Sequence, residues 1–166
     1  MDFKLRPWNL EDIESLVKYA NNTKIAENLT NQFPNPYKHE NGIRFIQMTL
    51  KDNPTQIFAI EVNGIACGAI GLHSQTDIYA RNMELGYWLA ESYWGKGIMT
   101  MAIKQIVDYG FKTFQIDRIF ARPFGTNISS QKVLEKAGFN LEARFEKTIY
   151  KNGEYLDELI YAIRKE

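Results

Sequence analysis

A strand that runs through a glycine-bearing turn into a helix is the feature that most constrains this chain. Residues 82–90 are predicted to form the strand, Gly95 and Gly97 follow it, and an apolar helical pattern begins at Ile98. The first N–H groups of a helix have no partners within it, so such a junction points several backbone donors at whatever lies above the turn. The helix dipole adds partial positive charge, and glycine lets a ligand approach the backbone without meeting a Cβ. The sequence therefore predicts an anion site for phosphate; the alternative is a glycine turn that serves only as punctuation.

A second group of motifs lies downstream, where Asn-x-x-Ser (127–130) is followed by Leu-Glu-Lys-Ala-Gly-Phe (134–139). Together with Glu-Leu-Gly-Tyr-Trp-Leu (84–89) and Tyr-Trp-Gly-Lys-Gly (93–97), these motifs resemble the Gcn5-related N-acetyltransferase (GNAT) superfamily. Within it they are similar to the RimJ/RimL-like branch of ribosomal-protein N-terminal acetyltransferases. The resemblance implies an α+β fold, with a central, mostly antiparallel mixed sheet that contains a splayed parallel strand pair and is flanked by helices. It also implies acetyl-CoA as the cofactor.

The resemblance assigns individual residues to that cofactor. It implies that the pantetheine arm of coenzyme A lies between the strand that ends at Leu89-Ala90 and the strand that ends at Arg122. The backbone N–H of Leu89 would then donate to the thioester carbonyl oxygen and stabilise the developing oxyanion. Asn127 is implied to bond the pantetheine, and its position also suits a plain helix N-cap. The pyrophosphate is implied to contact Gly95, Lys96, Gly97, Ile98, Met99 and Thr100.

Several positions depart from the superfamily pattern. Ser92 stands where Gln or Arg usually opens the phosphate motif, and Met99 stands where a glycine is common, but backbone donors survive both changes. The superfamily's frequent tyrosine acid, which protonates the departing thiolate, would fall at Leu134, and leucine cannot do that. In the ribosomal-protein branch a serine on the same helix replaces it, and Ser130 matches; the alternative for Ser130 is a serine that bonds the helix backbone. Lys96 either reaches a phosphate oxygen or is a solvated lysine.

An acceptor amine requires a base, because amines with a pKa of about 8 to about 10.4 arrive mostly protonated at neutral pH. Glu84, early in its strand, is the candidate base, acting directly or through water. A strand carboxylate is also commonly an ion-pair partner, here of Arg81 or Arg118. Glu158 and Glu61 are rival candidates for the base.

Composition limits the function classes. Lys and Arg together number 20, as do Asp and Glu, so no net field favours nucleic acid or an anionic membrane. The 166 residues predict one domain over 1–166. The start of the chain lacks a signal-peptide core and no apolar run approaches ~18 residues, so the expected location is cytoplasmic. Cys67, the only cysteine, is expected to fill space in the core, and no metal site is expected. His39 and His73 are expected to be structural or exposed.

Periodicity and turn signals place the remaining elements. Strands are expected over 3–7, 56–62, 65–74, 82–90, 116–122, 141–150 and 154–164, and helices over 10–20, 37–50, 97–113 and 128–137. One helical turn is expected near 25–29, and residues 98, 101, 102, 106 and 109 are expected to face inward. The Asn63-Gly64 and Asn152-Gly153 turns predict hairpins. The strand–helix–strand unit over 82–122 requires two parallel strands.

The residues and the resemblance together predict an acetyl-CoA-dependent N-acetyltransferase. Acetyl transfer is expected to occur directly in a ternary complex, and the acceptor is expected to be a primary amine, either a protein N-terminus or a small amine. A different class of answer is a non-catalytic acyl-CoA-binding or sensor domain. Terminal strands of the resembling family often pair between subunits, so a homodimer is left open.

Overall fold

The computed structural model describes all 166 residues, which form two compact units. The first unit comprises Met1–Gly71 and Gly86–Ala102, and the second comprises Leu72–Leu85 and Ile103–Glu166. Seven strands form one mixed sheet in the order β1-β2-β3-β4-β5-β7-β6. The predicted mixed α+β class is therefore confirmed, whereas the single domain stays a prediction.

The first unit begins with β1 (Lys4–Pro7), the 3-10 turn η1 (Leu10–Asp12) and helices α1 (Ile13–Ala20), α2 (Thr23–Ala26) and α3 (His39–Thr49). Asn9 caps η1, since its side-chain oxygen accepts from the N–H of Glu11 at 2.9 Å. Strand β2 (Ile57–Val62) pairs antiparallel with β1 and with β3 (Ile65–Ser74), whose last three residues belong to the second unit. Asn63 and Gly64 join β2 to β3 with φ angles of 51° and 81°, as the Asn-Gly signal predicts.

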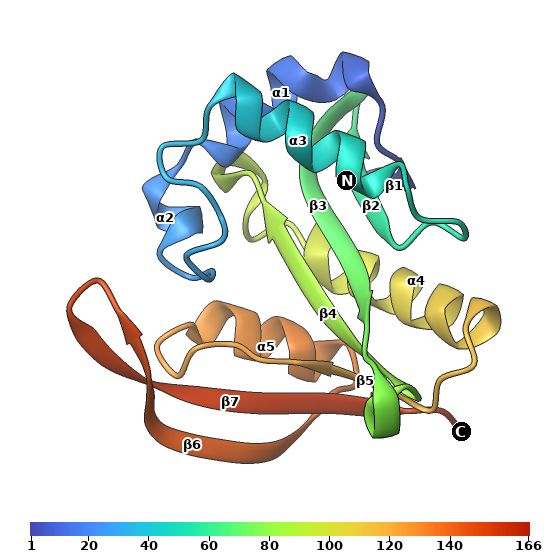
Figure 1. Ribbon diagram of the computed structural model, residues 1–166, viewed down its shortest axis with the longest axis vertical. Coiled ribbons are helices and arrows are strands. Elements are labelled where there is room, and N and C mark those ends of the chain that lie inside the picture. Colours follow the sequence, from blue (N-terminus) through green and yellow to red (C-terminus); the bar gives the residue numbers. More distant parts are fainter. The chain divides into compact units, whose positions relative to one another are not determined.

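Helices α1 and α3 lie side by side in the first unit (Figure 1). Their apolar faces and those of β2 and β3 form one core, which buries side chains that a helix or a half-buried strand presents at regular spacing. That core comprises Trp8, Leu16, Ala20, Tyr37, Ile46, Ile57, Ala59, Ala66 and Ala69.

The second unit contains the part of β4 (Asn82–Leu89) that pairs in parallel with β5 (Arg118–Ala121), in a register that runs from Asn82–Arg118 to Glu84–Phe120. Pairing therefore ends before β4 does. Two further 3-10 turns are η2 (Asp77–Tyr79) and, in the first unit, η3 (Glu91–Tyr93), and helix α4 (Ile98–Thr113) links the two units in sequence. The parallel pair confirms the prediction made from the strand–helix–strand unit.

Helix α5 (Ile128–Lys136) and the hairpin of β6 (Asn140–Lys151) and β7 (Glu154–Arg164) complete the second unit. Strand β7 pairs antiparallel with both β5 and β6. The hydroxyl of Tyr161 on β7 donates to Glu135 of α5 at 2.9 Å, and the turn end of the hairpin extends past α5 (Figure 1). Asn152 and Gly153 form that turn with φ angles of 52° and 78°.

One local prediction was wrong, and two elements differ in detail. Met101 is 49% exposed rather than inward, because the buried stripe of α4 runs through neighbouring pairs at four-residue spacing, such as Ala102-Ile103 and Ile106-Val107. The helical turn predicted near 25–29 is present as the short helix α2, which begins two residues earlier, at Thr23. The register of strand β6 is also irregular near Lys147, whose φ is 51° and whose N–H donates to Asp157 at 3.0 Å.

None of the helices combines the length and apolarity needed to cross a membrane.

Candidate functional site

The turn between η3 and α4 has the geometry that the sequence predicts for an anion site. Gly95 and Gly97 adopt φ angles of 72° and 77°, in the left-handed region that favours glycine. A Cβ built at either position has no atom within 4 Å, so space is open beside both residues. The N–H of Met101 donates to Gly97 O at 3.2 Å, which makes Gly97 the first acceptor of helix α4. The N–H groups of Ile98–Thr100 precede that bond and have no partner within the helix.

Lys96 folds back over this turn. Its ammonium donates to Ser92 O at 2.9 Å and lies 5.3 Å from the ring centroid of Tyr93. An ammonium has three donors, so the contact with Ser92 leaves capacity for an anion. The phosphate role of Lys96 stays a prediction.

Neighbouring residues of the first unit hold the start of the turn. The side-chain amide of Asn22 donates to Glu91 Oε2 at 2.9 Å, and Lys24 forms an ion pair with the same carboxylate. The hydrogen bond from Lys24 lowers the pKa of Glu91. The rings of Tyr19 and Tyr93 meet edge to face, with centroids 6.3 Å apart. The segment that follows α1 is thereby attached to η3 through charge and ring packing.

Strand β4 ends in the first unit at Leu89, which is buried, as is Ala90. The N–H of Ala90 donates to Cys67 O at 2.8 Å, and the indole N–H of Trp94 donates to Leu89 O at 2.7 Å. Cys67 is itself fully buried, and burial raises the pKa of its thiol to about 11. A protonated, buried thiol fits the interpretation of Cys67 as core filler.

In the second unit, Asn127 caps α5. Its side-chain oxygen accepts from the N–H of Ser130 at 3.2 Å, which confirms the N-cap and places these two predicted residues together. Gln131 braces the preceding loop, since its amide donates to Phe124 O at 3.2 Å and Gly125 O at 3.1 Å. Leu134, where the resemblance would place a tyrosine acid, is completely buried.

Glu84 forms a two-pronged ion pair with Arg122. The guanidinium Nε donates to Oε1 at 2.9 Å and Nη2 donates to Oε2 at 3.2 Å. This pair raises the pKa of Arg122. The expected partners of Glu84 were wrong, because Asp117 engages Arg81 and Glu142 engages Arg118. The parallel register explains the partner, since Arg122 is two residues beyond Phe120, which lies opposite Glu84.

The rival bases are held differently. Glu158 of β7 lies opposite Phe124 and is half-buried, and its negative charge contributes to the raised pKa of Arg122. Glu61 of β2 is bound by Arg6 and by Lys4, the latter at 3.1 Å. Hydrogen bonding to Arg6 lowers the pKa of Glu61. Glu61 of β2 is thus joined to β1 through both of these ion pairs.

The predicted site residues fall into two groups. The first unit holds Leu89, Ala90, Gly95, Lys96, Gly97, Ile98, Met99 and Thr100, and the second holds Glu84, Asn127 and Ser130. Sequence reasoning missed two contacts, the Glu84–Arg122 pair and the Trp94–Leu89 hydrogen bond. The strand register would have indicated the former, and no sequence signal indicates the latter.

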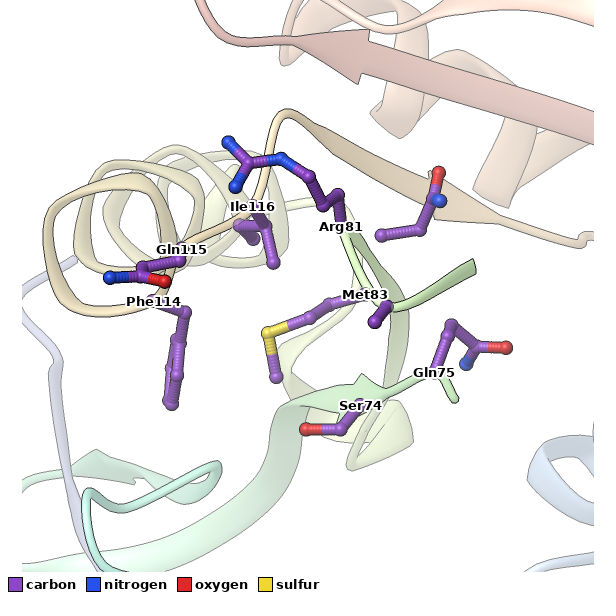
Figure 2. Close-up of a pocket in the computed structure, with 9 residues that line it drawn as sticks. Ser74, Gln75, Arg81, Met83, Phe114, Gln115 and Ile116 are labelled. Carbon is purple, nitrogen blue, oxygen red and sulfur yellow. The ribbon is translucent and has the colours of Figure 1, made fainter. Parts of the chain in front are cut away.

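A separate pocket of about 340 Å³ lies within the second unit (Figure 2). Its lining comprises Ser74, Gln75, Ala80, Arg81, Asn82, Met83, Phe114, Gln115 and Ile116, and includes none of the predicted site residues. Arg81 at its rim donates to Asp117, one bond measuring 2.7 Å. No group of three or more His, Cys, Asp or Glu side chains is placed to hold a metal ion.

The sequence matches the model of a known protein family over most of its length. The family described as "Acetyltransferase (GNAT) domain" matches residues 2–140. The chain belongs to the GNAT acetyltransferase family. That match includes every predicted site residue, from Glu84 to Ser130. Acetyl-CoA is the co-substrate of this family.

Several GNAT relatives resemble the chain. YdaF of Bacillus subtilis (strain 168) is 34% identical over 103 residues, or 62% of this chain. Spermidine N(1)-acetyltransferase of Escherichia coli (strain K12) is 25% identical over 158 residues, covering 92% of this chain and 80% of that protein. Ribosomal-protein-serine acetyltransferase of the same strain is 29% identical over 82 residues, covering 49% of this chain and 46% of that protein. The chain spans about half the length of the first curated relatives it matches, 56% of YdaF and 44% of YjcK.

Solved GNAT structures share the fold. A GNAT acetyltransferase from Bacillus anthracis superposes with a TM-score of 0.84 and 25% identity, covering 99% of this chain and 95% of that one. The Microcin C7 self-immunity acetyltransferase MccE, solved with acetyl-CoA and AMP, gives 0.82 and 26% identity, covering 99% and 93%. The resemblance to GNAT proteins that the motifs indicate is thereby confirmed.

The turn geometry predicts that Gly97→Val weakens coenzyme A binding by at least about tenfold, or ~1.4 kcal/mol. The valine side chain would occupy the open space beside the α4 N-terminus and block close approach of an anion to the backbone. Isothermal titration calorimetry with coenzyme A measures the effect.

Gly153→Val is the matched control, because Gly153 has a φ of 78° and equally open surroundings in the β6–β7 turn. Both substitutions strain the backbone alike, but only Gly97 lies at the candidate phosphate site. Only Gly97→Val should therefore reduce the affinity for coenzyme A. Equal affinities in the two variants, with both folded by circular dichroism, would remove the phosphate assignment.

Proposed function

We propose that the protein is an acetyl-CoA-dependent N-acetyltransferase that transfers the acetyl group directly to a primary amine. The observation that supports this most strongly is the turn at Gly95 and Gly97, which opens helix α4 with N–H groups that have no helical partner. Membership of the GNAT family supplies the cofactor, and the proposal extends to a single functional domain over 1–166. The activity of the whole protein is part of the same proposal.

The cofactor is assigned to backbone groups first. N–H groups from Gly95 to Thr100 would bind the pyrophosphate, with Lys96 adding charge. The N–H of Leu89 would donate to the thioester oxygen, where loss of such a donor typically costs about 100- to 1,000-fold in rate. Asn127 accepts from Ser130 through its oxygen, so its amide nitrogen is the group that would donate to pantetheine.

Glu84 is assigned the base. An ionised carboxylate has about four acceptor positions, and the Arg122 fork uses two of them. The remaining positions can accept a proton from the acceptor amine or from an intervening water. The amine nitrogen then bonds to the acetyl carbon, the C–S bond breaks, and Ser130 gives its hydroxyl proton to the departing thiolate and is reprotonated from solvent.

The acceptor belongs to the class of primary amines. Relatives carry names for spermidine acetylation and for ribosomal-protein acetylation, and the amines of both are primary. A protein N-terminus and a small amine are therefore both tested. The outcome also separates an enzyme from an acyl-CoA-binding or sensor domain.

The direct experiment is release of free thiol from acetyl-CoA, followed with a thiol reagent. The panel contains spermidine, single amino acids and peptides with free N-termini, and N-acetylated peptides serve as blocked controls. We expect thiol release with at least one free amine, and the acetylated product by mass spectrometry. Tight coenzyme A binding without release for any amine would favour the sensor domain.

Glu84→Gln should lower kcat/KM by about 100-fold or more near neutral pH, because the amide keeps the shape but cannot take a proton. Raising the pH should restore much of the loss, since an α-amine with a pKa near 8 then arrives deprotonated. Initial rates across pH 6 to 9 measure both effects.

The matched control is Glu142→Gln, which neutralises a carboxylate bound by Arg118 and Arg164 in the same unit. It should lower activity little at any pH. Wild-type activity of Glu84→Gln throughout the range would make Glu84 a structural carboxylate and transfer the base role to Glu158 or water.

Ser130→Ala should lower kcat by about tenfold or more while the affinity for acetyl-CoA stays within a few-fold, because the hydroxyl is needed for thiolate departure rather than docking. Steady-state kinetics and calorimetry separate the two. Ser129→Ala changes an exposed neighbour on the same helix and should have no effect. A kcat within twofold of wild type would mean that water protonates the thiolate.

A further inference from the structure

The peptide group that joins Leu89 to Ala90 is held at both of its polar atoms. Its N–H, which belongs to Ala90, donates to Cys67 O at 2.8 Å. Its carbonyl, which belongs to Leu89, accepts from the indole N–H of Trp94 at 2.7 Å. Two hydrogen bonds near the short end of the usual range fix the plane of this peptide.

The preceding peptide, which carries the N–H of Leu89, is packed against β3. A Cβ built on Gly68 would lie 2.6 Å from Trp88 O and 3.2 Å from Leu89 Cα. A real Cβ does not come within 2.6 Å of a backbone oxygen, so glycine is what permits this approach. The backbone is therefore contacted on both sides of Leu89, by β3 before it and by the two hydrogen bonds after it.

Trp94 differs from the other two restraints because it is not part of the sheet. Trp94 is 44% exposed, yet the only polar group of its side chain donates to the carbonyl of Leu89, at the buried end of β4. Trp94 also directly precedes Gly95, the first glycine of the turn. One side chain thus joins the end of β4 to the start of the candidate phosphate site.

We propose that Trp94 is a positioning residue that aims the Leu89 N–H at the thioester oxygen of acetyl-CoA. The proposal rests on the proposed acetyl transfer, with the Leu89 N–H as its oxyanion donor. An oxyanion donor is effective only when it is preorganised toward the developing charge, so freedom at the Leu89–Ala90 peptide should weaken carbonyl polarisation. Trp94 acts through Leu89 and needs no contact with the substrate.

The test removes the indole N–H and reads the carbonyl directly. Trp94→Phe deletes the donor and keeps an aromatic ring, and replacement of Trp94 by β-(3-benzothienyl)alanine exchanges only the N–H for sulfur. Isotope-edited infrared spectroscopy of acetyl-CoA labelled with ¹³C at the carbonyl, bound without acceptor, reports polarisation. In the wild type we expect the carbonyl band at lower wavenumber than in free acetyl-CoA.

Both replacements should move that band at least halfway back toward free acetyl-CoA and lower kcat by about tenfold, with the KM for acetyl-CoA within threefold. Tyr79→Phe alters an exposed aromatic residue of η2 that has no part in the candidate site, and should leave the band and kcat unchanged. If Trp94→Phe misfolds, the benzothienyl variant decides, since its shape is that of tryptophan.

Two results would overturn the inference and are distinguishable. A band and kcat equal to wild type in the benzothienyl variant would show that the indole N–H does not position Leu89, while acetyl transfer stands. A wild-type band equal to that of free acetyl-CoA would remove the Leu89 donor itself, and the role of Trp94 with it.

Discussion

Unpaired N–H groups at the start of helix α4 are the constraint on which the proposed chemistry depends. A helix leaves these donors without partners by its own geometry, and here Gly95 and Gly97 lead into it with positive φ and no side chain. Side-chain contacts also hold residues 91–94, the segment that leads into these glycines. Glu91 is bound by Asn22 and Lys24, and Trp94 is bonded to the end of β4. The candidate anion site consists of backbone groups, and side chains that need not contact the anion hold the segment that carries them.

The ion pairs of the second unit orient side chains more than they stabilise the fold. Arg81 and Asp117 pair before the strands β4 and β5 begin, and Arg122 and Glu84 pair near the end of their register. Exposed ion pairs contribute little to folding, typically about 0–1 kcal/mol. The Glu84 side chain is more shielded, at 25% exposure, and both its oxygens are held by a planar fork. Such a fork fixes the direction of the carboxylate, which is what a base in direct transfer requires.

Sequence reasoning predicted the features that depend on local chemistry. The Asn-Gly hairpins, the Asn127 cap and the parallel pair follow from φ preferences, capping and chain connectivity, and all are confirmed. Features set by tertiary packing were missed. Glu84 pairs with Arg122 because the parallel register brings Arg122 to its side of the sheet, and Met101 is exposed because burial follows a different stripe of α4. The hydrogen bond from Trp94 to Leu89 O depends on where the turn places the indole. The periodicity of the sequence does not predict that position.

Amide chemical shifts in coenzyme A titrations test the central claim most directly, because they report on the backbone groups themselves. In ¹H–¹⁵N spectra, saturating coenzyme A should shift the amides of Gly95, Gly97 and Ile98 most. The amides of Gly64 and Gly153, which have similar φ angles in hairpin turns, should stay in place. Unchanged amides at Gly95, Gly97 and Ile98 in the presence of bound coenzyme A would contradict the account.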